Sequence, residues 1–311
     1  MRILIAGLGS IGSLLAVYLS PFHKIYAVGR PWHIQAIKER GYLLGKIIFQ
    51  KKEVKAKLEG VSDNFAAFGN RIFDIIFITV KAYDTEKVID DMIRNNIAGK
   101  SYILLQNGLG NEEIAIQFLK NKNIIRGITN NGANIPEPGT VVHAGLGETF
   151  LGKVSGAETN YWLDTVSKIL NTAGLPTRVV SDLKPYLFRK VLINATINPL
   201  TALLKIRNIG IYENQFIREI LHNITYEIVE VAKAYGIEIE NAEETVLSVA
   251  KATGNNLSSM LQDILRGKRT EIDFINGKII ELAQKKNIDV PANKLIYLLI
   301  KALENIENYK V

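Results

Sequence analysis

The sequence predicts an α/β fold in which a doubly wound parallel sheet is followed by a second, all-helical C-terminal domain. Two observations lead to this prediction. Over residues 1–181, short apolar runs typical of buried strands alternate with helix-like segments. Over residues 182–311, strand-like runs become rare and apolar residues recur at helical spacing. We therefore expect two domains, with the boundary near residue 181.

The elements of the first domain are expected in alternating order. Buried strands are predicted at residues 2–6, 24–28, 74–80, 101–106, 123–129 and 177–180. Helices are predicted at residues 13–19, 31–40, 85–95, 112–120 and 158–172. Two β-hairpins are predicted in addition, at residues 46–57, where lysines alternate with apolar residues, and at residues 139–152. Strands and helices that alternate at this spacing are typical of a parallel sheet with helices on both faces.

The second domain is predicted to be helical from residue 182 to residue 307. One apolar stripe comprises Leu221, Ile224, Ile228 and Val231, and another comprises Ile272, Ile275, Ile279 and Leu282. We expect Pro199 to kink or end its helix, because proline lacks the N–H that donates to the carbonyl four residues earlier. Asn198 would then lie at the end of that helix.

The composition excludes several classes of protein. With 47% hydrophobic and 22% charged residues, the chain has a globular balance, and no apolar run reaches the roughly 18 residues of a membrane span. The N-terminus lacks a signal-peptide pattern, so we expect a cytoplasmic protein without a membrane partner. The sequence has no cysteine, and its four histidines have no ligand spacing, so no metal site is expected. The net charge of +7 favours anionic substrates, but no nucleic-acid motif accompanies it, so no nucleic-acid partner is expected.

A glycine motif, Gly7-Leu8-Gly9-Ser10-Ile11-Gly12, lies between the first predicted strand and the first predicted helix. In this context the first glycine permits a tight turn, the second lets the backbone approach a pyrophosphate, and the third lets helix and strand pack closely. The N–H groups and the dipole of the helix N-terminus then favour the anion. The motif predicts a Rossmann domain that binds a dinucleotide through these six residues.

The end of the second predicted strand distinguishes between the two nicotinamide dinucleotides. NAD-binding folds usually place a carboxylate there, which binds the 2′-hydroxyl of the adenosine ribose. Here the strand ends with Val28-Gly29-Arg30, and an arginine is suited to binding a 2′-phosphate. We therefore favour NADP as the cofactor, with NAD as the alternative.

Lys190, Asn194 and Asn198 recur at intervals of four residues in a segment that is otherwise apolar. At 3.6 residues per turn they form one polar row along a helix. If this row is buried it needs polar partners, and a ligand with a carboxylate, a carbonyl and a hydroxyl supplies them. The lysine ammonium can polarise a ketone and then protonate the alkoxide that hydride addition produces. The alternative is a solvated stripe on a surface helix.

Five segments of the sequence resemble the ketopantoate reductase family. They are Val80–Ala82, Gln106–Gly110, Lys190–Ala202, Asn256–Asp263 and Thr270–Gly277. The resemblance spans nearly the whole chain in a consistent order, which makes it more specific than the glycine motif alone. Members of the family reduce 2-dehydropantoate to (R)-pantoate, usually with NADPH, on the route to pantothenate and coenzyme A. The resemblance implies the same reaction here, in a cleft between the two domains.

The resemblance also implies roles for individual residues. Lys190 is expected to be the catalytic proton donor. Besides the glycine motif and Arg30, the residues expected to contact the cofactor are Lys81, Asn107, Ala133 and Glu271. The residues expected to bind the substrate are Asn107, Lys190, Asn194, Asn198, Asn208, Asn256 and Ser259. Glu271 also follows a predicted N-cap, Thr270, where the helix dipole by itself favours a carboxylate.

Two other functions remain open at this point. A β-hydroxyacid dehydrogenase has a similar architecture and also uses a helical lysine followed four residues later by an asparagine. The segments Ser258–Asp263 and Thr270–Asp273 favour ketopantoate reductase instead. A non-catalytic NADP sensor would leave the polar row unexplained. The expected partner is a small keto acid, and a homodimer is compatible with the sequence.

Overall fold

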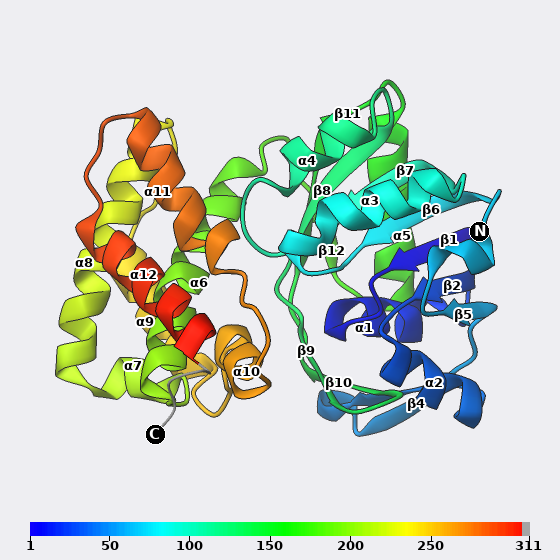
Figure 1. The fold of residues 1–311 in the computed structure, drawn as a ribbon, viewed down its shortest axis with the longest axis horizontal. Coiled ribbons are helices and arrows are strands. Elements are labelled where there is room, and N and C mark those ends of the chain that lie inside the picture. Colours follow the sequence, from blue (N-terminus) through cyan, green and yellow to red (C-terminus); the bar gives the residue numbers. More distant parts are fainter. Residues whose placement is uncertain (307–311) are drawn as a thin grey trace. The chain divides into compact units, whose positions relative to one another are not determined.

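The computed structural model describes residues 1–306, in which two compact units are distinguished (Figure 1). Unit 1 consists of Met1–Gln106 and Asn111–Leu183. Unit 2 consists of the segment Asn107–Gly110 and of the chain from Lys184 onward. The sequence pattern changes near residue 181, and nothing in it indicates that four residues of the first half belong with the helices of the second.

Unit 1 contains an eight-stranded sheet in the order β5-β2-β1-β6-β7-β8-β11-β12. Its strands are β1 (Arg2–Ala6), β2 (Lys24–Val28), β5 (Gly60–Ser62), β6 (Ile72–Ile78), β7 (Ala98–Leu104), β8 (Asn123–Thr129), β11 (Thr149–Ser155) and β12 (Thr177–Val179). The six strands from β5 to β8 are parallel, whereas β11 runs antiparallel to β8. By chain order these six strands are arranged 3-2-1-4-5-6, which confirms the predicted doubly wound sheet.

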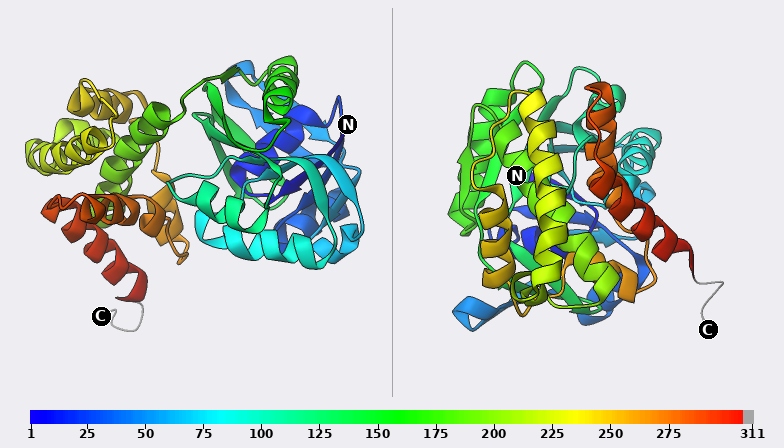
Figure 2. Two further views of the ribbon diagram at one scale, coloured as in Figure 1. Left: turned by 90° about the horizontal axis from the view of Figure 1, so that it is seen from above. Right: turned by 90° about the vertical axis from the view of Figure 1, so that its left-hand side faces the viewer.

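Helices cover both faces of this sheet (Figure 2). They are α1 (Ser10–Leu19), α2 (Pro31–Arg40), α3 (Thr85–Arg94), α4 (Asn111–Phe118) and α5 (Thr159–Ala173). Because side chains alternate along a strand, Ile3 and Ile5 of β1 enter the core beneath α1 and α5, whereas Leu4 and Ala6 enter the core beneath α3 and α4. Burial of both faces explains why the strand is apolar at almost every position.

A second sheet packs against α1 in the order β4-β3-β10-β9. Its strands are β3 (Leu43–Ile47), β4 (Lys52–Ala56), β9 (Gly132–Glu137) and β10 (Thr140–Gly145). The strands β3 and β4 form the antiparallel hairpin predicted at residues 46–57. The hairpin predicted at residues 139–152 is wrong, because β10 pairs with the preceding strand β9 and β11 joins the other sheet. The turn falls at Gly139, whose φ of +72° is a conformation that glycine adopts without strain.

Unit 2 confirms the predicted all-helical domain. Its helices are α6 (Lys184–Leu204), α7 (Ile209–Glu213), α8 (Gln215–Ala234), α9 (Ala242–Ala252), α10 (Ser259–Leu265), α11 (Asn276–Lys285) and α12 (Pro291–Asn305). The predicted stripe on α8 is fully buried and consists of Leu221, Ile224, Ile228 and Val231. No helix within residues 1–306 has both the length and the apolar character that crossing a membrane requires.

The second predicted stripe does not lie on one helix. Residues Ile272–Phe274 form a single 3₁₀ turn, η4, and α11 begins only at Asn276. The break falls at Ile275, whose φ of −108° and ψ of −93° lie outside the helical region. Ile272, Ile275 and Ile279 are nevertheless buried, so the apolar pattern reflects their packing and not a continuous helix.

The sequence predicts a kink or an end of the helix at Pro199; the helix end is wrong, and the kink stays a prediction. Helix α6 continues through Pro199, and Asn198 therefore lies inside the helix. The carbonyl of Ala195, which has no helical donor because Pro199 lacks an N–H, accepts a hydrogen bond from Asn276 Nδ2 (3.0 Å). A side chain from another part of unit 2 thus supplies the donor that the helix lacks.

His33 of α2 is buried and joins three parts of unit 1. Its Nδ1 accepts a hydrogen bond from the N–H of Gly139 (3.0 Å), so the proton of the neutral ring is on Nε2, which lies 3.1 Å from Ser13 Oγ of α1. Burial lowers the pKa of His33 from its usual 6.5 to about 4. The imidazole is therefore neutral around pH 7.

We expect His33 to make the fold sensitive to acid. Because its pKa is lower in the folded state, the unfolded chain binds the proton first, and stability is lost as the pH falls from 6.5 toward 4. The loss should be about 3 kcal/mol between pH 7 and pH 4. Urea unfolding at these two pH values measures it, with His33→Gln as the variant that lacks the titrating ring. Equal losses in the parent and the variant would contradict the assignment.

Candidate functional site

In unit 1 the predicted cofactor residues follow three neighbouring strands of the main sheet. The glycine loop follows β1, Arg30 comes two residues after β2, and Lys81 comes three residues after β6. Since β2, β1 and β6 are adjacent and parallel, their carboxyl ends meet at one edge of the sheet. The strand order reverses between β1 and β6, and open α/β sheets bind ligands at such a point.

The glycine loop is shaped by close packing at Gly7 and Gly12. Gly7 has a φ of +109°, and a Cβ there would lie 2.6 Å from the backbone nitrogen of Val80. A Cβ on Gly12 would lie 2.1 Å from the carbonyl oxygen of Gly7. Thr79 Oγ1 fixes the turn further by donating a hydrogen bond to Gly7 O (2.7 Å). Neither glycine can therefore carry a side chain without displacing the loop.

Gly9 differs from these two glycines because it faces open space. A Cβ on Gly9 would meet no atom of residues 1–306 within 4 Å. Gly9 is also the N-cap of α1, and it makes no side-chain capping bond to the first turn of this helix. The N–H groups of that turn can therefore bind a ligand, and the helix dipole favours an anionic one.

Arg30 is exposed at the N-cap of α2, and Pro31 occupies the first helical position. Its guanidinium pairs with no acidic side chain of residues 1–306. The preceding Gly29 packs against the loop so closely that a Cβ there would lie 2.7 Å from the Cβ of Leu8. Arg30 is thus the first side chain beyond the contact between β2 and the glycine loop.

Ala133, the remaining cofactor residue predicted in unit 1, belongs to the second sheet. It lies in β9, opposite His143 of β10, and packs against the core beneath α1. The structure therefore brings the glycine loop, Arg30 and Lys81 to one edge of the main sheet, and it places Ala133 on a separate sheet.

In unit 2, helix α6 carries the predicted polar row. Lys190 and Asn194 are half-buried and Asn198 is buried. Desolvation lowers the pKa of the Lys190 ammonium from its usual 10.5. A lysine with a lowered pKa releases its proton more readily than a solvated lysine does, and this property suits a proton donor.

Asn198 and Ser259 come together beside this row. The amide Nδ2 of Asn198 donates to Ser259 Oγ (3.5 Å). Ser259 begins α10, and the preceding Ser258 caps that helix by accepting a hydrogen bond from the N–H of Leu261 (3.1 Å). Thr201, one turn after Asn198 on α6, donates to Ser258 Oγ (2.7 Å). Hydroxyl groups and one amide therefore join α6 to α10 at the position of Asn198.

Asn208 and Asn256 form a second pair in unit 2. The N–H of Asn208 donates to the carbonyl of Asn256 (3.1 Å), and Asn208 Nδ2 donates to Thr253 Oγ1 (2.9 Å). Asn208 Oδ1 is buried and accepts no hydrogen bond from residues 1–306. An acceptor in this position is suited to a ligand that donates a hydrogen bond.

Asn107 and Glu271 also meet within unit 2. Asn107 Nδ2 donates to Glu271 Oε2 (3.3 Å), and Glu271 is buried at the start of η4. The segment Asn107–Gly110 is fixed by its backbone, since the N–H of Leu109 donates to the carbonyl of Phe274 (2.9 Å). A Cβ on Gly108 would lie 2.4 Å from that same oxygen. Gly108 thus permits a close backbone approach to Phe274, three residues after Glu271.

Comparison with known proteins assigns the chain to a family. Two family models match it, "Ketopantoate reductase PanE/ApbA" over residues 3–156 and "Ketopantoate reductase PanE/ApbA C terminal" over residues 182–304. The chain belongs to the ketopantoate reductase family. A curated relative, the 2-dehydropantoate 2-reductase of Pyrococcus horikoshii, is 35% identical to it over 98% of both chains. The family expected from the sequence motifs is therefore confirmed.

Solved structures share the fold of this family member over its whole length. A ketopantoate reductase of Ralstonia eutropha superposes with a TM-score of 0.89 at 24% identity, covering 99% of this chain and 100% of that one. A D-mandelate dehydrogenase, solved with NADH and anilino(oxo)acetate, has a TM-score of 0.89 at 26% identity and is covered completely in both directions. The ketopantoate reductase fold is thus shared with a D-mandelate dehydrogenase that was solved with NADH.

Arg126 supports this site, although it was not among the residues predicted from the sequence. It is buried in β8, where its guanidinium donates to the carbonyls of Leu104 (3.1 Å) and Gln106 (2.8 Å) and pairs with Glu112 (3.4 Å). It thereby fixes the residue that directly precedes Asn107. The signal in the sequence is a single arginine inside an otherwise apolar strand, because an arginine is buried only where partners satisfy it.

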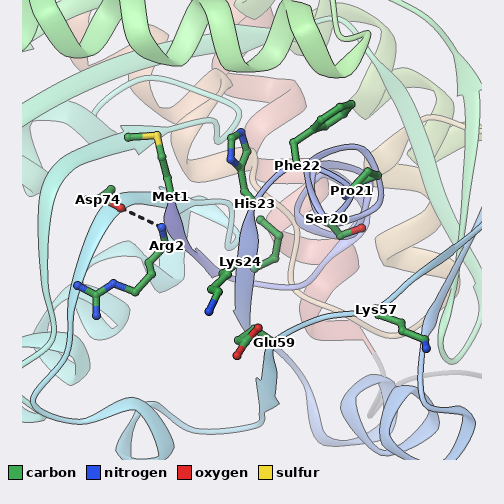
Figure 3. Close-up of a pocket in the computed structure, with 11 residues that line it drawn as sticks. Met1, Arg2, Ser20, Pro21, Phe22, His23, Lys24, Lys57, Glu59 and Asp74 are labelled. Carbon is green, nitrogen blue, oxygen red and sulfur yellow. Dashed lines mark hydrogen bonds between the residues drawn. The ribbon is translucent and has the colours of Figure 1, made fainter.

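A surface pocket of unit 1 lies at the opposite end of the main sheet (Figure 3). It is lined near the amino ends of β1, β2 and β6, by Arg2, Lys24 and Asp74 among others. The glycine loop, Arg30 and Lys81 follow the carboxyl ends of the same three strands. This pocket is therefore not part of the candidate site.

The two kinds of glycine in the loop lead to a prediction. We expect Gly12→Ala to lower the free energy of unfolding by about 1–3 kcal/mol, because the added methyl group overlaps the Gly7 carbonyl. Gly9→Ala is the matched control and should change stability by less than about 0.5 kcal/mol, since its methyl group meets no atom. Chemical denaturation of both variants measures the difference. Equal stability of the two variants would contradict the loop geometry.

Proposed function

We propose that this chain reduces the ketone of 2-dehydropantoate to the hydroxyl group of (R)-pantoate, with NADPH as the hydride donor. The observation that carries the proposal is the polar row of α6 in a chain of this family. A desolvated lysine, Lys190, is followed at one-turn intervals by Asn194 and Asn198. An ammonium and two amides on one face of a helix can bind the carbonyl, carboxylate and hydroxyl groups of a keto acid.

The residues at the edge of the main sheet fit a dinucleotide. The open space at Gly9 and the uncapped N-terminus of α1 would hold the pyrophosphate, and Arg30 would bind the 2′-phosphate of NADPH. The family resemblance implies four further cofactor contacts, which are Lys81, Ala133, Asn107 and Glu271. When bound, NADPH supplies the hydride that adds to the ketone carbon.

Lys190 would perform the acid catalysis. Its ammonium polarises the ketone and then donates a proton to the oxygen that becomes the hydroxyl group. Asn194, Asn198 and Ser259 would bind the carboxylate and hydroxyl groups of the substrate, because amides and hydroxyls offer both donors and acceptors. Asn107, Asn208 and Asn256 would complete the set of substrate contacts.

A second candidate is the reduction of another 2-keto acid, and the similarity to D-mandelate dehydrogenase favours it. An absorbance assay at the nicotinamide band tests both candidates with the purified chain. We expect the highest kcat/KM with 2-dehydropantoate and NADPH. A higher kcat/KM with phenylglyoxylate, the keto acid that corresponds to mandelate, would replace the proposed substrate, and binding of NADPH without turnover would indicate a sensor.

We expect Lys190→Ala to lower kcat by about 10²–10⁴-fold, which is the usual contribution of a positioned general acid. The KM for NADPH should stay within about twofold of the parent value, because the variant removes a proton donor and no cofactor contact. Arg189→Ala is the control, since Arg189 is the exposed neighbour on the same helix. Steady-state kinetics on folded variants measures both constants, and a parent-like kcat for Lys190→Ala would refute the assignment.

We expect Arg30→Ala to weaken NADPH binding by about 10- to 150-fold and to leave NADH binding nearly unchanged, because only NADPH carries a 2′-phosphate. Lys38→Ala, which removes an exposed cation farther along α2, should change neither affinity. The ratio of kcat/KM for the two cofactors in parent and variants is the measurement. A parent enzyme that prefers NADH would overturn NADP as the cofactor.

A further inference from the structure

Unit 2 contains a buried chain of polar groups that the proposed reaction does not use. It runs from the carboxylate of Glu227 on α8, through the side chains of Asn293 and Asn276, to the carbonyl of Ala195 on α6. Asn276 and Asn293 are both 0% exposed and Glu227 is 8% exposed. Buried polar groups of this kind need a reason, because apolar side chains would pack there without hydrogen-bonding requirements.

Pro199 explains why this series of buried polar groups ends at the carbonyl of Ala195. In a regular helix the N–H of residue 199 would donate to the carbonyl of Ala195, and proline has no such hydrogen. Asn276 Nδ2 takes that place at 3.0 Å from the oxygen. Asn198 directly precedes Pro199, so this hydrogen bond lies on the turn of α6 from which the Asn198 side chain reaches Ser259.

The orientation of each amide follows from its partners. Asn293 Nδ2 faces two acceptors, Glu227 Oε2 (2.8 Å) and the carbonyl of Ile224 (3.3 Å), so Asn293 Oδ1 must face Asn276. That oxygen lies 3.1 Å from Asn276 Nδ2, which is therefore the donor in this contact as well as in the contact with Ala195. The Glu227 carboxylate is fixed in turn by the N–H groups of Ala292 (2.7 Å) and Asn293 (2.9 Å) at the start of α12.

Asn276 also lies close in sequence to Glu271, the residue that the Asn107 amide contacts. It begins α11, two residues after Phe274, whose carbonyl binds the segment Asn107–Gly110, and five residues after Glu271. One residue thus connects the segment that carries Glu271 to the turn of α6 that carries Asn198.

We propose that Asn276 is a positioning residue: by donating to the carbonyl that Pro199 leaves free, it fixes the substrate-binding turn of α6 relative to the segment of Glu271. This proposal rests on the proposed function, because it assumes that Asn198 and Glu271 act on one reaction. Asn276 itself would touch neither substrate nor cofactor.

Four variants of the full chain test the proposal: Asn276→Leu, Pro199→Ala, the double variant and Thr225→Val. Leucine is close to asparagine in size but donates no hydrogen bond, so the Ala195 carbonyl is left unpaired. Pro199→Ala restores a backbone N–H that can donate to the Ala195 carbonyl, so this carbonyl no longer depends on Asn276 for a hydrogen bond. Thr225→Val is the control, because Thr225 is buried on α8 and, among residues 1–306, its hydroxyl bonds only within its own helix.

We expect Asn276→Leu to lower kcat/KM for 2-dehydropantoate by about tenfold or more. The KM for NADPH should change by less than about twofold, because the lost hydrogen bond lies on α6 and Glu271 keeps its own hydrogen bond with Asn107. Thr225→Val should leave both parameters near the parent values. The double variant should recover most of the kcat/KM that Asn276→Leu loses. It should also unfold at a urea concentration closer to the parent midpoint than Asn276→Leu does. If Asn276→Leu does not fold, recovery of a folded double variant supports the same conclusion.

Three results would overturn the proposal. The first is a parent-like kcat/KM for Asn276→Leu, and the second is an equal loss of kcat/KM for the keto acid and for NADPH. The third is a double variant whose kcat/KM or urea midpoint is no better than that of Asn276→Leu. The unfolding measurements require no substrate. Absence of turnover in the parent would therefore refute the proposed function, whereas absence of coupling between Pro199 and Asn276 in unfolding would refute this inference.

Discussion

A proline inside α6 removes one backbone donor from the helix that carries Lys190, Asn194 and Asn198, and a side chain from another helix of unit 2 replaces that donor. Proline in a helix interior costs about 3 kcal/mol or more when the freed carbonyl finds no other donor. Here Asn276 supplies the donor, and Asn293 and Glu227 fix the amide that does so. Four helices, α6, α8, α11 and α12, therefore meet through one directed series of hydrogen bonds. Helix α6 continues through Pro199 to Leu204, so Asn198 lies inside the helix and not at its end.

Unit 1 depends on a steric constraint of a different kind. Gly7 and Gly12 lie where any side chain would collide with the backbone, whereas Gly9 lies where a side chain would meet no atom of residues 1–306. The first two glycines are therefore needed by the fold, whereas no contact within residues 1–306 requires the third, which leaves room for a ligand to approach the backbone. This separation supports a dinucleotide function for the loop more directly than the motif does, because a loop that only turned the chain would leave Gly9 without a purpose.

Much of the fold and part of the candidate site could be predicted because they depend on local patterns. The strands predicted at residues 2–6, 24–28 and 123–129 coincide with β1, β2 and β8, since a strand buried on both faces must be apolar along its length. The polar row of α6 depends only on helical spacing, and the glycine loop and Arg30 lie at the ends of predictable strands. Their placement at one sheet edge followed once the strands were known to be parallel.

By itself, the sequence determined the class of fold, the alternation of most strands and helices of unit 1, and the family, through patterns that act within a few turns or strands. The tertiary structure decided that α6 passes through Pro199, that the helix expected around Ile275 is broken, and that β10 pairs with β9. It also decided the contacts of Asn107 with Glu271 and of Asn276 with Ala195. In each case the deciding partner comes from a separate element, often far away in the chain. Local propensity could not reveal it, because a missing donor or a break is tolerated only where folding brings a compensating group within hydrogen-bonding distance.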